Sequence, residues 1–295
     1  MTSDLYSYRY HELSLKSGRI SYIDEGSGKS VLLLHGAPIT SLGFMRMIDR
    51  LKEGYRVIAP DLPGFGRSCA NADFNGRLED YSRFVKEFCK ELNLDGFYIY
   101  LFDSAGCIGL NAASDFSTKL SGLILSDTVA LPMTGRSWFV RFVLRYIVTS
   151  LPMRFLNRKL NLLAWLVATV APILKPFSRQ ERDLLIKQYD TPEKRDRVLD
   201  IFYQMGWNET FINEAVENIK NGLKRVPTLL IYGQFDPVRI AGAISHYRKT
   251  FHDCTWKIIP FEEHFPILGS GEKVAQEIDS WIKQKEAEKI KLRFQ

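Results

Sequence analysis

Three short polar stretches carry residue types that could perform nucleophilic catalysis. The stretch "LFDSAGCIG" (Leu101–Gly109) holds two adjacent candidate nucleophiles, Asp103 and Ser104, whereas "GQFDP" supplies Asp236 and "FEEHFP" supplies His264. A nucleophile, an acid and a histidine in this chain order form a set in which the acid orients the histidine. An ionised aspartate attacks an alkyl carbon, and a serine transfers an acyl group, so the identity of the nucleophile decides the reaction.

The sharp turn that would carry the nucleophile favours Asp103 over Ser104. Residues two positions before and after a nucleophile on such a turn should not be bulky. For Asp103 these residues are Leu101 and Ala105, whereas Ser104 would place Phe102 at one of them. We therefore predict that Asp103 is the nucleophile, with Ser104 as the alternative.

Apolar runs that alternate with amphipathic segments must position these residues. Strands are expected at 10–15, 18–26, 30–36, 97–102, 120–128, 226–233 and 254–260, with another beginning at 55. Helices are expected at 41–54, 78–94, from the nucleophile turn to about 114, 241–251 and 272–284. This alternation predicts an α/β fold with a mostly parallel, doubly wound sheet. Ligands bind such sheets at the carboxyl ends of the strands, where Ala37, Asp103, Asp236 and His264 would lie.

The middle of the chain breaks the alternation. Residues 129–222 contain only helical patterns and prolines, so we expect an inserted helical cap over a core domain made of residues 1–128 and 223–295. Between Thr128 and Gln180 there is no acidic residue, and the basic residues are Arg136, Arg141, Arg145, Arg154, Arg158, Lys159, Lys175 and Arg179. Such a basic, apolar segment favours a membrane surface or an acidic or apolar ligand. The longest uncharged run, Leu160–Leu174, is shorter than the roughly 20 residues of a membrane span.

The composition indicates a cellular location and excludes several classes of binding partner. The four cysteines have no metal-binding or disulfide-framework spacing, which fits a reducing, cytoplasmic location. The net charge of +6 comes without a nucleic-acid-binding motif, and metalloprotease, P-loop and dinucleotide-binding motifs are absent. We expect a small, apolar substrate, no cofactor, no metal and no nucleic acid. Peripheral membrane contact through the cap is a further expectation, and no oligomeric state is predicted.

Three motifs carry a resemblance to a known family. The segments "HGAPITSLGFMRMID", "RVIAPDLPGFGRS" and "LNLDGFYIYLFDSAGCIGL" resemble the haloalkane dehalogenase and epoxide hydrolase branch of the α/β-hydrolase superfamily. The resemblance spans nearly the whole chain except the cap and the last ten residues. It implies an α/β-hydrolase fold with an inserted helical cap. It also implies a catalytic triad of Asp103, Asp236 and His264, with an oxyanion hole formed by the backbone N–H groups of Ala37 and Ser104.

The resemblance also implies a reaction. Asp103 would form an ester with the electrophilic carbon of an epoxide, alkyl halide or strained lactone, and His264 would activate the water that hydrolyses it. The sequence departs from the dehalogenase pattern, because Ser104 and Ala37 replace the tryptophan and asparagine that hold the halide there. Tyr146 and a second tyrosine, Tyr203, resemble the cap tyrosines of epoxide hydrolases and are predicted to bind substrate. A carboxylesterase or lipase that uses Ser104, and a non-catalytic binding protein on the same fold, are the alternatives.

Overall fold

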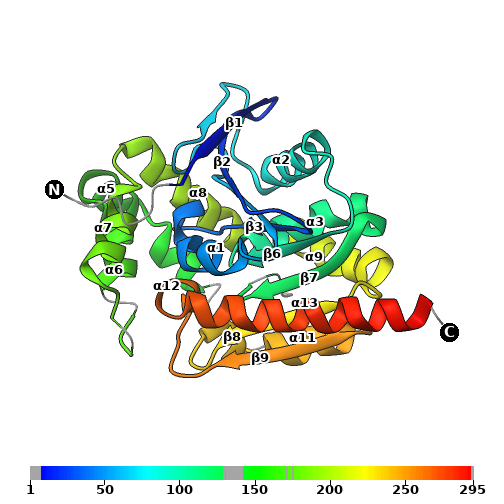
Figure 1. The fold of residues 1–295 in the computed structure, drawn as a ribbon. Coiled ribbons are helices and arrows are strands. Elements are labelled where there is room, and N and C mark those ends of the chain that lie inside the picture. Colours follow the sequence, from blue (N-terminus) through cyan, green and yellow to red (C-terminus); the bar gives the residue numbers. More distant parts are fainter. Residues whose placement is uncertain (1–7, 129, 131–141, 170–171, 175, 294–295) are drawn as a thin grey trace.

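A single mostly parallel sheet organises the protein (Figure 1). The computed structural model describes residues 8–128, 130, 142–169, 172–174 and 176–293. Its strands are β1 (Tyr10–Leu15), β2 (Gly18–Glu25), β3 (Ser30–Leu34), β4 (Arg56–Pro60), β5 (Cys69–Ala70), β6 (Phe97–Phe102), β7 (Leu120–Ser126), β8 (Thr228–Gly233) and β9 (Cys254–Ile259). In this part of the chain they follow the order β1-β2-β4-β3-β6-β7-β8-β9, with β5 on β2. Every pairing from β4 to β9 is parallel and the pairings of β2 are antiparallel, which confirms the predicted fold class.

Helices cover both faces of the sheet, as alternating strands and helices require. On one face α1 (Met45–Leu51) packs with α13 (Gly271–Arg293), and the other face carries α2 (Leu78–Glu91), α3 (Ala105–Ala113) and α11 (Ala243–Thr250). The remaining core elements are η1 (Ser41–Phe44), η2 (Ser114–Lys119), α10 (Pro237–Ile240) and α12 (Pro266–Gly269). All residues of β6 and β8 are buried, which explains why these strands are apolar without alternation.

Two glycines bring the start of α3 close to the strand ends. A Cβ atom at Gly106 would lie 1.9 Å from Cγ2 of Thr128, and one at Gly109 would lie 2.3 Å from Cδ2 of Leu101. Only glycine fits at such approaches, because real Cβ atoms do not come this near to other atoms. The helix therefore begins directly above the ends of β6 and β7.

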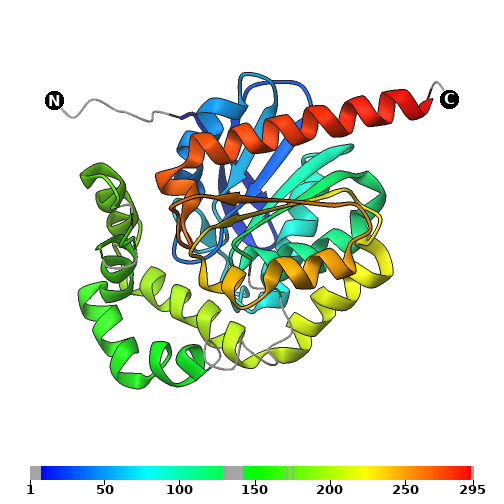
Figure 2. The ribbon, with the colours of Figure 1, turned by 90° about the horizontal axis from the view of Figure 1, so that it is seen from below.

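The middle of the chain is helical wherever it is described. It comprises η4 (Val143–Val148), α5 (Leu151–Leu160), α6 (Leu162–Thr169), α7 (Arg179–Lys187), α8 (Pro192–Trp207), α9 (Glu209–Asn218) and η5 (Ile219–Leu223). Figure 2 shows these helices as an arc along one side of the core. The arc is tied to the core where the N–H of Leu174 donates to Oε1 of Glu263 at 2.6 Å and where Thr40 bonds Gln188. No helix in the described ranges is long and apolar enough to cross a membrane.

The arginines of this helical arc are paired with acids from farther along the chain. Arg145 pairs with Glu209 at 2.7 Å and Arg154 pairs with Asp200 at 2.9 Å. Arg158 pairs with two acids of α8, Glu193 and Asp196. Three of the basic residues of the sequence window are thus paired in space, whereas no ion pair with a described residue is seen for Lys159 or Arg179, and Arg136, Arg141 and Lys175 lie outside the described residues.

Candidate active site

The turn between β6 and α3 separates the two candidate nucleophiles. Asp103 has a φ of +50°, the left-handed conformation that non-glycine residues rarely adopt. Ser104 has helical angles (φ −62°, ψ −24°) and stands at the N-cap of α3. Asp103 therefore occupies the strained tip of the turn, where a nucleophile is held above the sheet. This geometry agrees with the steric argument that favours Asp103.

The carboxylate of Asp103 is buried against the loop that follows β3. Its Oδ2 atom has no hydrogen-bond partner within the described structure, and a Cβ atom at Gly36 would lie only 2.6 Å from it. The glycine thus makes room for the carboxylate. Oδ2 is therefore buried against this loop and makes no hydrogen bond within the described structure.

The predicted oxyanion donors lie beside the turn. The N–H of Ala37 donates to Oγ of Ser104 at 3.1 Å, and both residues are almost fully buried. The Ser104 hydroxyl therefore occupies one of the two donors predicted to stabilise an oxyanion. His35 links this loop to the loop after β4, because its Nε2 atom accepts a hydrogen bond from the N–H of Leu62 at 2.9 Å.

His264 bridges the two predicted carboxylates. Its Nδ1 atom lies 2.5 Å from Oδ2 of Asp236, and its Nε2 atom lies 3.1 Å from Oδ1 of Asp103. Asp236 is fully buried, and its other oxygen caps α10 by accepting from the N–H of Arg239 at 2.6 Å. Asp236 therefore caps α10 with one oxygen and contacts His264 with the other. The structure brings together all three residues of the predicted triad.

Two carboxylates control the protonation of His264. Burial alone would lower the pKa of this imidazole, but the charges and hydrogen bonds of Asp236 and Asp103 outweigh it and raise the pKa well above 6.5. Ionised carboxylates only accept hydrogen bonds, so an imidazolium that donates from both nitrogens satisfies this geometry. The histidine is thus held charged while Asp103 is ionised.

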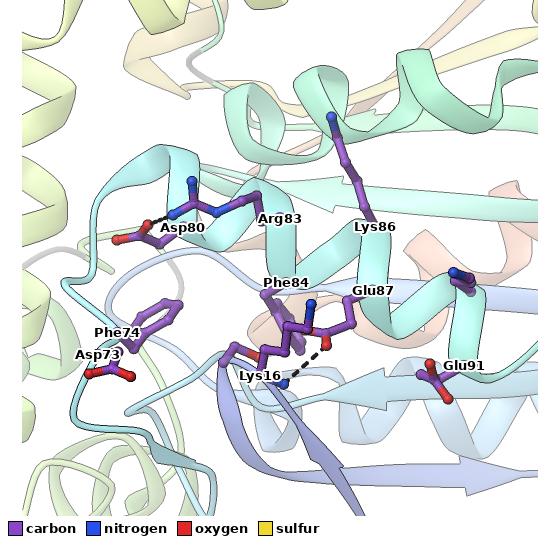
Figure 3. Close-up of a pocket in the computed structure, with 11 residues that line it drawn as sticks. Lys16, Asp73, Phe74, Asp80, Arg83, Phe84, Lys86, Glu87 and Glu91 are labelled. Atoms are coloured by element: carbon purple, nitrogen blue, oxygen red, sulfur yellow. Dashed lines mark hydrogen bonds and ion pairs between the residues drawn. The ribbon is translucent and has the colours of Figure 1, made fainter.

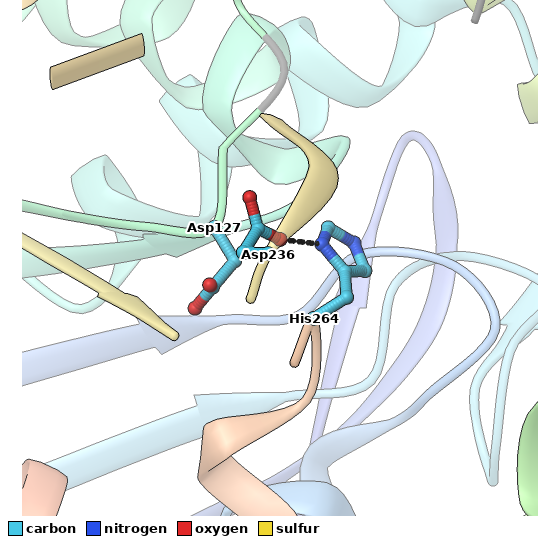
Figure 4. A group of neighbouring side chains, drawn as sticks. All are labelled: Asp127, Asp236 and His264. Carbon is cyan, nitrogen blue, oxygen red and sulfur yellow. Dashed lines mark hydrogen bonds and ion pairs between the residues drawn. The ribbon is translucent and has the colours of Figure 1, made fainter. Parts of the chain in front are cut away.

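A third acid, Asp127, adjoins the triad (Figure 4). Asp127 follows β7, is fully buried, and lies within 4.8 Å of ligand atoms of Asp236 and His264. Burial, and then the charge of Asp236, raise the pKa of Asp127 well above its usual value. The sequence analysis overlooked this residue, although an acid at the end of the apolar run "LILSD" was the available signal.

The same three residues have the composition of a metal site, but their atoms are already engaged. Oδ1 of Asp127 accepts from the N–H of Gly233 at 2.9 Å, and its Oδ2 accepts from Oγ of Ser126 at 2.8 Å. Nδ1 of His264 and Oδ2 of Asp236 bond each other. A cation here would have to break these bonds, so the group fits a hydrogen-bonded network better than a metal centre.

Two cavities adjoin the triad. The inner cavity, of about 210 Å³, lies under the helical arc and is lined by Asp103, Ser104, Leu144, Phe202, Met205, Pro237, Val238 and His264. The outer cavity, of about 180 Å³, is lined by Pro172, Phe177, Phe235, Pro237, Glu262, Glu263, His264 and Phe265. His264 and Pro237 belong to both walls. Apolar side chains from cap and core therefore surround the candidate triad.

The two predicted cap tyrosines lie away from these cavities. Tyr146 is 56% exposed and Tyr203 is 46% exposed, and both rings contact Trp207, at centroid distances of 5.9 and 6.1 Å. Their neighbours Leu144 and Phe202 line the inner cavity instead. The structure thus brings neither tyrosine to Asp103, and the cavity-lining residues of the cap were not recognised in the sequence.

A larger cavity, of about 500 Å³, lies against α2 and beside Lys16 and Phe74 (Figure 3). Its rim carries both signs of charge: Arg83 pairs with Asp80, and Glu87 accepts a hydrogen bond from the backbone N–H of Lys16 at 3.0 Å. Phe74 and Phe84 form its floor. None of the triad residues reaches it, so it is separate from the candidate active site.

The chain matches proteins of one family over most of its length. The model of the α/β hydrolase fold matches residues 29–270. Haloalkane dehalogenase 2 of Mycobacterium tuberculosis is 25% identical over 282 residues, covering 93% of this chain and 95% of the relative. A cis-3-alkyl-4-alkyloxetan-2-one decarboxylase of Shewanella oneidensis is 24% identical, covering 80% of this chain and 76% of the relative.

A solved structure shows the same fold. The haloalkane dehalogenase of Bradyrhizobium elkani superposes with a TM-score of 0.84 at 20% identity, covering 95% of this chain and 99% of that one. The resemblance seen in the sequence motifs is thereby confirmed. From its strand order, its matched residues and these relatives, we conclude that this chain belongs to the α/β hydrolase fold family.

Proposed function

We propose that this α/β-fold hydrolase uses Asp103 to attack an electrophilic carbon and forms an alkyl ester with it. The observation that carries the proposal is the position of Asp103 at the tip of the turn, 3.1 Å from Nε2 of His264. A nucleophile at a strained strand–helix turn, beside a histidine oriented by a buried acid, is the arrangement expected of covalent catalysis.

The first step is attack by the carboxylate of Asp103. The new C–O bond forms as the bond to the leaving group breaks, and that group keeps the electron pair. Esterification removes the negative charge of Asp103, so one of the causes that raise the pKa of His264 disappears. His264 can then release its proton to the departing oxygen and become neutral.

The second step uses His264 as a base. The neutral Nε2 atom accepts a proton from water, and the hydroxide attacks Cγ of the Asp103 ester. Asp236 stabilises the imidazolium that results, through Nδ1. The N–H groups of Ala37 and Ser104 are placed to stabilise the oxyanion when the Ser104 hydroxyl gives up its bond to Ala37. Collapse of this intermediate releases the alcohol and restores the carboxylate.

A strained oxygen ring suits this site better than an alkyl halide. The position directly after the nucleophile is Ser104, a hydroxyl suited to an oxygen leaving group, and the rest of the inner cavity wall is apolar apart from Asp103 and His264. The relative from Shewanella oneidensis is named for a four-membered lactone ring. We therefore propose an epoxide or a strained lactone as the substrate.

The esterase alternative receives less support. Oγ of Ser104 bonds the N–H of Ala37, whereas Nε2 of His264 lies against Asp103. A serine nucleophile needs its hydroxyl within reach of the histidine base. Ser104 also has ordinary helical backbone angles.

Single-turnover hydrolysis in ¹⁸O-labelled water tests the proposal. With enzyme in excess over a reactive epoxide, the label enters the peptide that contains Asp103, because the ester carbonyl carbon is the atom attacked by water. Enzyme incubated in labelled water without epoxide is the control. Label in the product alone, with none in Asp103, contradicts the ester mechanism, and an acyl adduct on Ser104 supports the esterase alternative.

We also propose that residues 129–222 act as the cap over a core of 1–128 and 223–295. Leu144, Phe202 and Met205 of this segment line the inner cavity, which supports a role in substrate selection. The four cysteines are free, which supports the cytoplasmic location.

Peripheral membrane contact through the cap rests on apolar rather than basic side chains. Leu151 is 82% exposed and Leu160 is 66% exposed on α5, whereas Arg154 and Arg158 of that helix are paired with acids. We therefore propose that vesicle binding depends weakly on lipid charge. Co-sedimentation with neutral and anionic vesicles tests this, with Leu151→Gln as the variant expected to bind less. Absence of binding to both vesicle types contradicts membrane contact.

A further inference from the structure

One side chain of α8, Gln204, joins the helical arc to the core at the start of α2. Its Nε2 atom donates to the carbonyl of Gly76 at 2.8 Å, and its Oε1 atom accepts from the N–H of Leu78 at 2.8 Å. Leu78 is the first residue of α2, and the first N–H groups of a helix have no partner inside the helix. The amide of Gln204 therefore satisfies a donor and an acceptor of two buried core residues at once.

The loop that receives this amide has no side chain at the point of contact. Gly76 has a φ of +71°, and a Cβ atom there would lie 2.1 Å from Nη1 of Arg197. Arg197 and Gln204 are seven residues apart, so they lie on the same face of α8. Asn208, at the C-terminal end of α8, donates to Oε1 of Glu79 at 2.7 Å. One face of α8 thus contacts the loop before α2 and the first turn of α2.

The neighbours of Gln204 in the chain form part of the wall of the inner cavity. Phe202 and Met205 line that cavity, and Sδ of Met205 lies 3.4 Å from Sγ of Cys107 in the first turn of α3. The side chains of a helix keep fixed angles to one another about its axis. A rotation or shift of α8 that displaced Gln204 would therefore displace Phe202 and Met205 as well.

The remaining cap residue of this wall is attached to α8. Leu144 belongs to η4, whose Arg145 donates to the carbonyl of Gly206 and pairs with Glu209 at 2.7 Å. The guanidinium of Arg145 also lies 4.4 Å from the ring centroid of Trp207. Because η4 is bonded to the C-terminal end of α8, the cap side of the inner cavity forms one unit.

Resting on the proposed function, we propose that Gln204 is a positioning residue that determines substrate specificity. Its two hydrogen bonds set how closely the cap side of the inner cavity approaches Asp103. This separation limits the length of the apolar arm that the cavity admits beside the reacting carbon. In the described structure Gln204 does not line the cavity, so it acts through the placement of Phe202 and Met205.

An amide defines the position of α8 more narrowly than an apolar side chain would. A hydrogen bond weakens steeply when its angle falls below about 120°, so two bonds in opposite directions fix both distance and orientation. Apolar contacts are not directional. Without the amide, the N–H of Leu78 and the carbonyl of Gly76 lose this partner, and a shift of α8 that admits water would satisfy them.

The other attachments of the helical arc do not depend on Gln204. Asn111 of α3 donates its side-chain N–H to the carbonyl of Phe211 in α9 at 2.9 Å. Thr40 bonds Gln188 at the C-terminal end of α7. The arc is therefore held on both sides of α8, so a substitution of Gln204 should move one wall of the cavity without detaching the cap.

Terminal epoxides with alkyl arms of increasing length test the proposal. In the wild-type enzyme, kcat/KM should rise about fourfold per methylene until the arm fills the inner cavity, and then stop rising at a length limit. Gln204→Met keeps the length of the side chain and removes both hydrogen bonds, so the length limit should move to longer arms. The ratio of kcat/KM for the longest arm to that for 1,2-epoxybutane should increase about tenfold or more, as expected for roughly two further buried methylenes.

Two other variants separate positioning from a general effect of substitution. Gln188→Met removes another glutamine contact between the arc and the core, and α7 lends no described residue to the inner cavity, so the length limit should not change. Gln204→Glu keeps an acceptor for the N–H of Leu78 but can donate to Gly76 only when its carboxyl group is protonated. Its length limit should therefore lie nearer to the wild-type value at about pH 5 than at about pH 8. Thermal unfolding shows whether each variant folds.

Calorimetric binding of straight-chain alcohols measures the same length limit without turnover. An unchanged limit in Gln204→Met, an equal shift in Gln188→Met, or a limit in Gln204→Glu that does not depend on pH overturns the role of Gln204 while the ester mechanism stands. No turnover of any epoxide, together with no adduct on Asp103, refutes the proposed function instead. The alcohols then test Gln204 alone: a longer limit in Gln204→Met supports its positioning role, and an equal limit or no binding overturns it.

Discussion

Replacing His264 with glutamine should separate the two chemical steps. His264 bonds the carboxylate of Asp103, the proposed nucleophile, through Nε2, which lies 3.1 Å from Oδ1. Ester formation needs an ionised carboxylate and a proton for the departing oxygen, which water can supply in the variant, whereas ester hydrolysis needs a base. The variant His264→Gln should therefore form the ester on Asp103 and fail to release it.

The lifetime of the trapped ester follows from the rate enhancement that general-base catalysis by His264 would provide. General-base catalysis accounts for about 10²–10⁴-fold in rate. If the wild-type enzyme turns over at about 10 s⁻¹, a typical value, its ester lasts about 0.1 s. The ester of the variant should then last on the order of 10 to 10³ s. Manual acid quenching is fast enough to capture it.

Intact-protein mass spectrometry after mixing with a cis-dialkyl epoxide measures the adduct. The expected result is a mass increase equal to one substrate, located on the peptide with Asp103. His252→Gln is the matched control, because His252 is exposed and outside the site, and it should behave as wild type. If the His264→Gln variant binds the epoxide but carries no adduct, then His264 is not the base for the second step.

Three further outcomes follow from the site. Asp103→Ala should abolish turnover, whereas Ser104→Ala should keep at least a few per cent; initial rates with a cis epoxide measure both, and the reverse pattern favours the esterase reading. The pKa of His264 is higher in the folded protein than in the unfolded chain, where it is near 6.5. The protonated histidine therefore stabilises the folded state fully below pH 6.5, and this stabilisation is lost as the pH rises through the folded-state pKa. The stability advantage of wild type over His264→Gln in urea unfolding should thus shrink from pH 6 upward, and a constant difference contradicts the charge network. Gly36→Ala should lower kcat at least about tenfold, because its Cβ would lie 2.6 Å from Oδ2 of Asp103; unchanged kcat in a folded variant shows that the carboxylate can move.

Local pattern was sufficient to predict the core strands and the proximity of the three candidate triad residues. The strand of Phe97–Phe102 is a continuous apolar run, and parallel strands buried on both faces have this composition. Because the carboxyl ends of parallel strands meet at one edge, Asp103, Asp236 and His264 could be placed together without coordinates. The choice between Asp103 and Ser104 depended on side-chain size alone, and the backbone angle of Asp103 agrees with it.

The cap was less predictable, because its contacts join residues far apart in the chain. Arg154 and its partner Asp200 are 46 positions apart, so no window of the sequence contains both. The sequence window therefore could not show that Arg145, Arg154 and Arg158 are paired with acids. On a helix that contacts both solvent and cavity, neighbouring side chains point about 100° apart, so one can face the cavity and the next the solvent. Tyr203 points to Trp207 and its neighbour Phe202 lines the inner cavity.

The left-handed backbone at Asp103 has a consequence for the balance between stability and activity. An aspartate in this conformation costs on the order of 1 kcal/mol that the rest of the fold must offset. Glycine adopts such angles freely. A chain that used this fold only to bind ligands would therefore be more stable with glycine at this position. The protein instead carries a destabilising residue at the one point where a carboxylate can reach both cavity and histidine. Selection for greater thermal stability alone would thus act against the residue proposed to perform the chemistry.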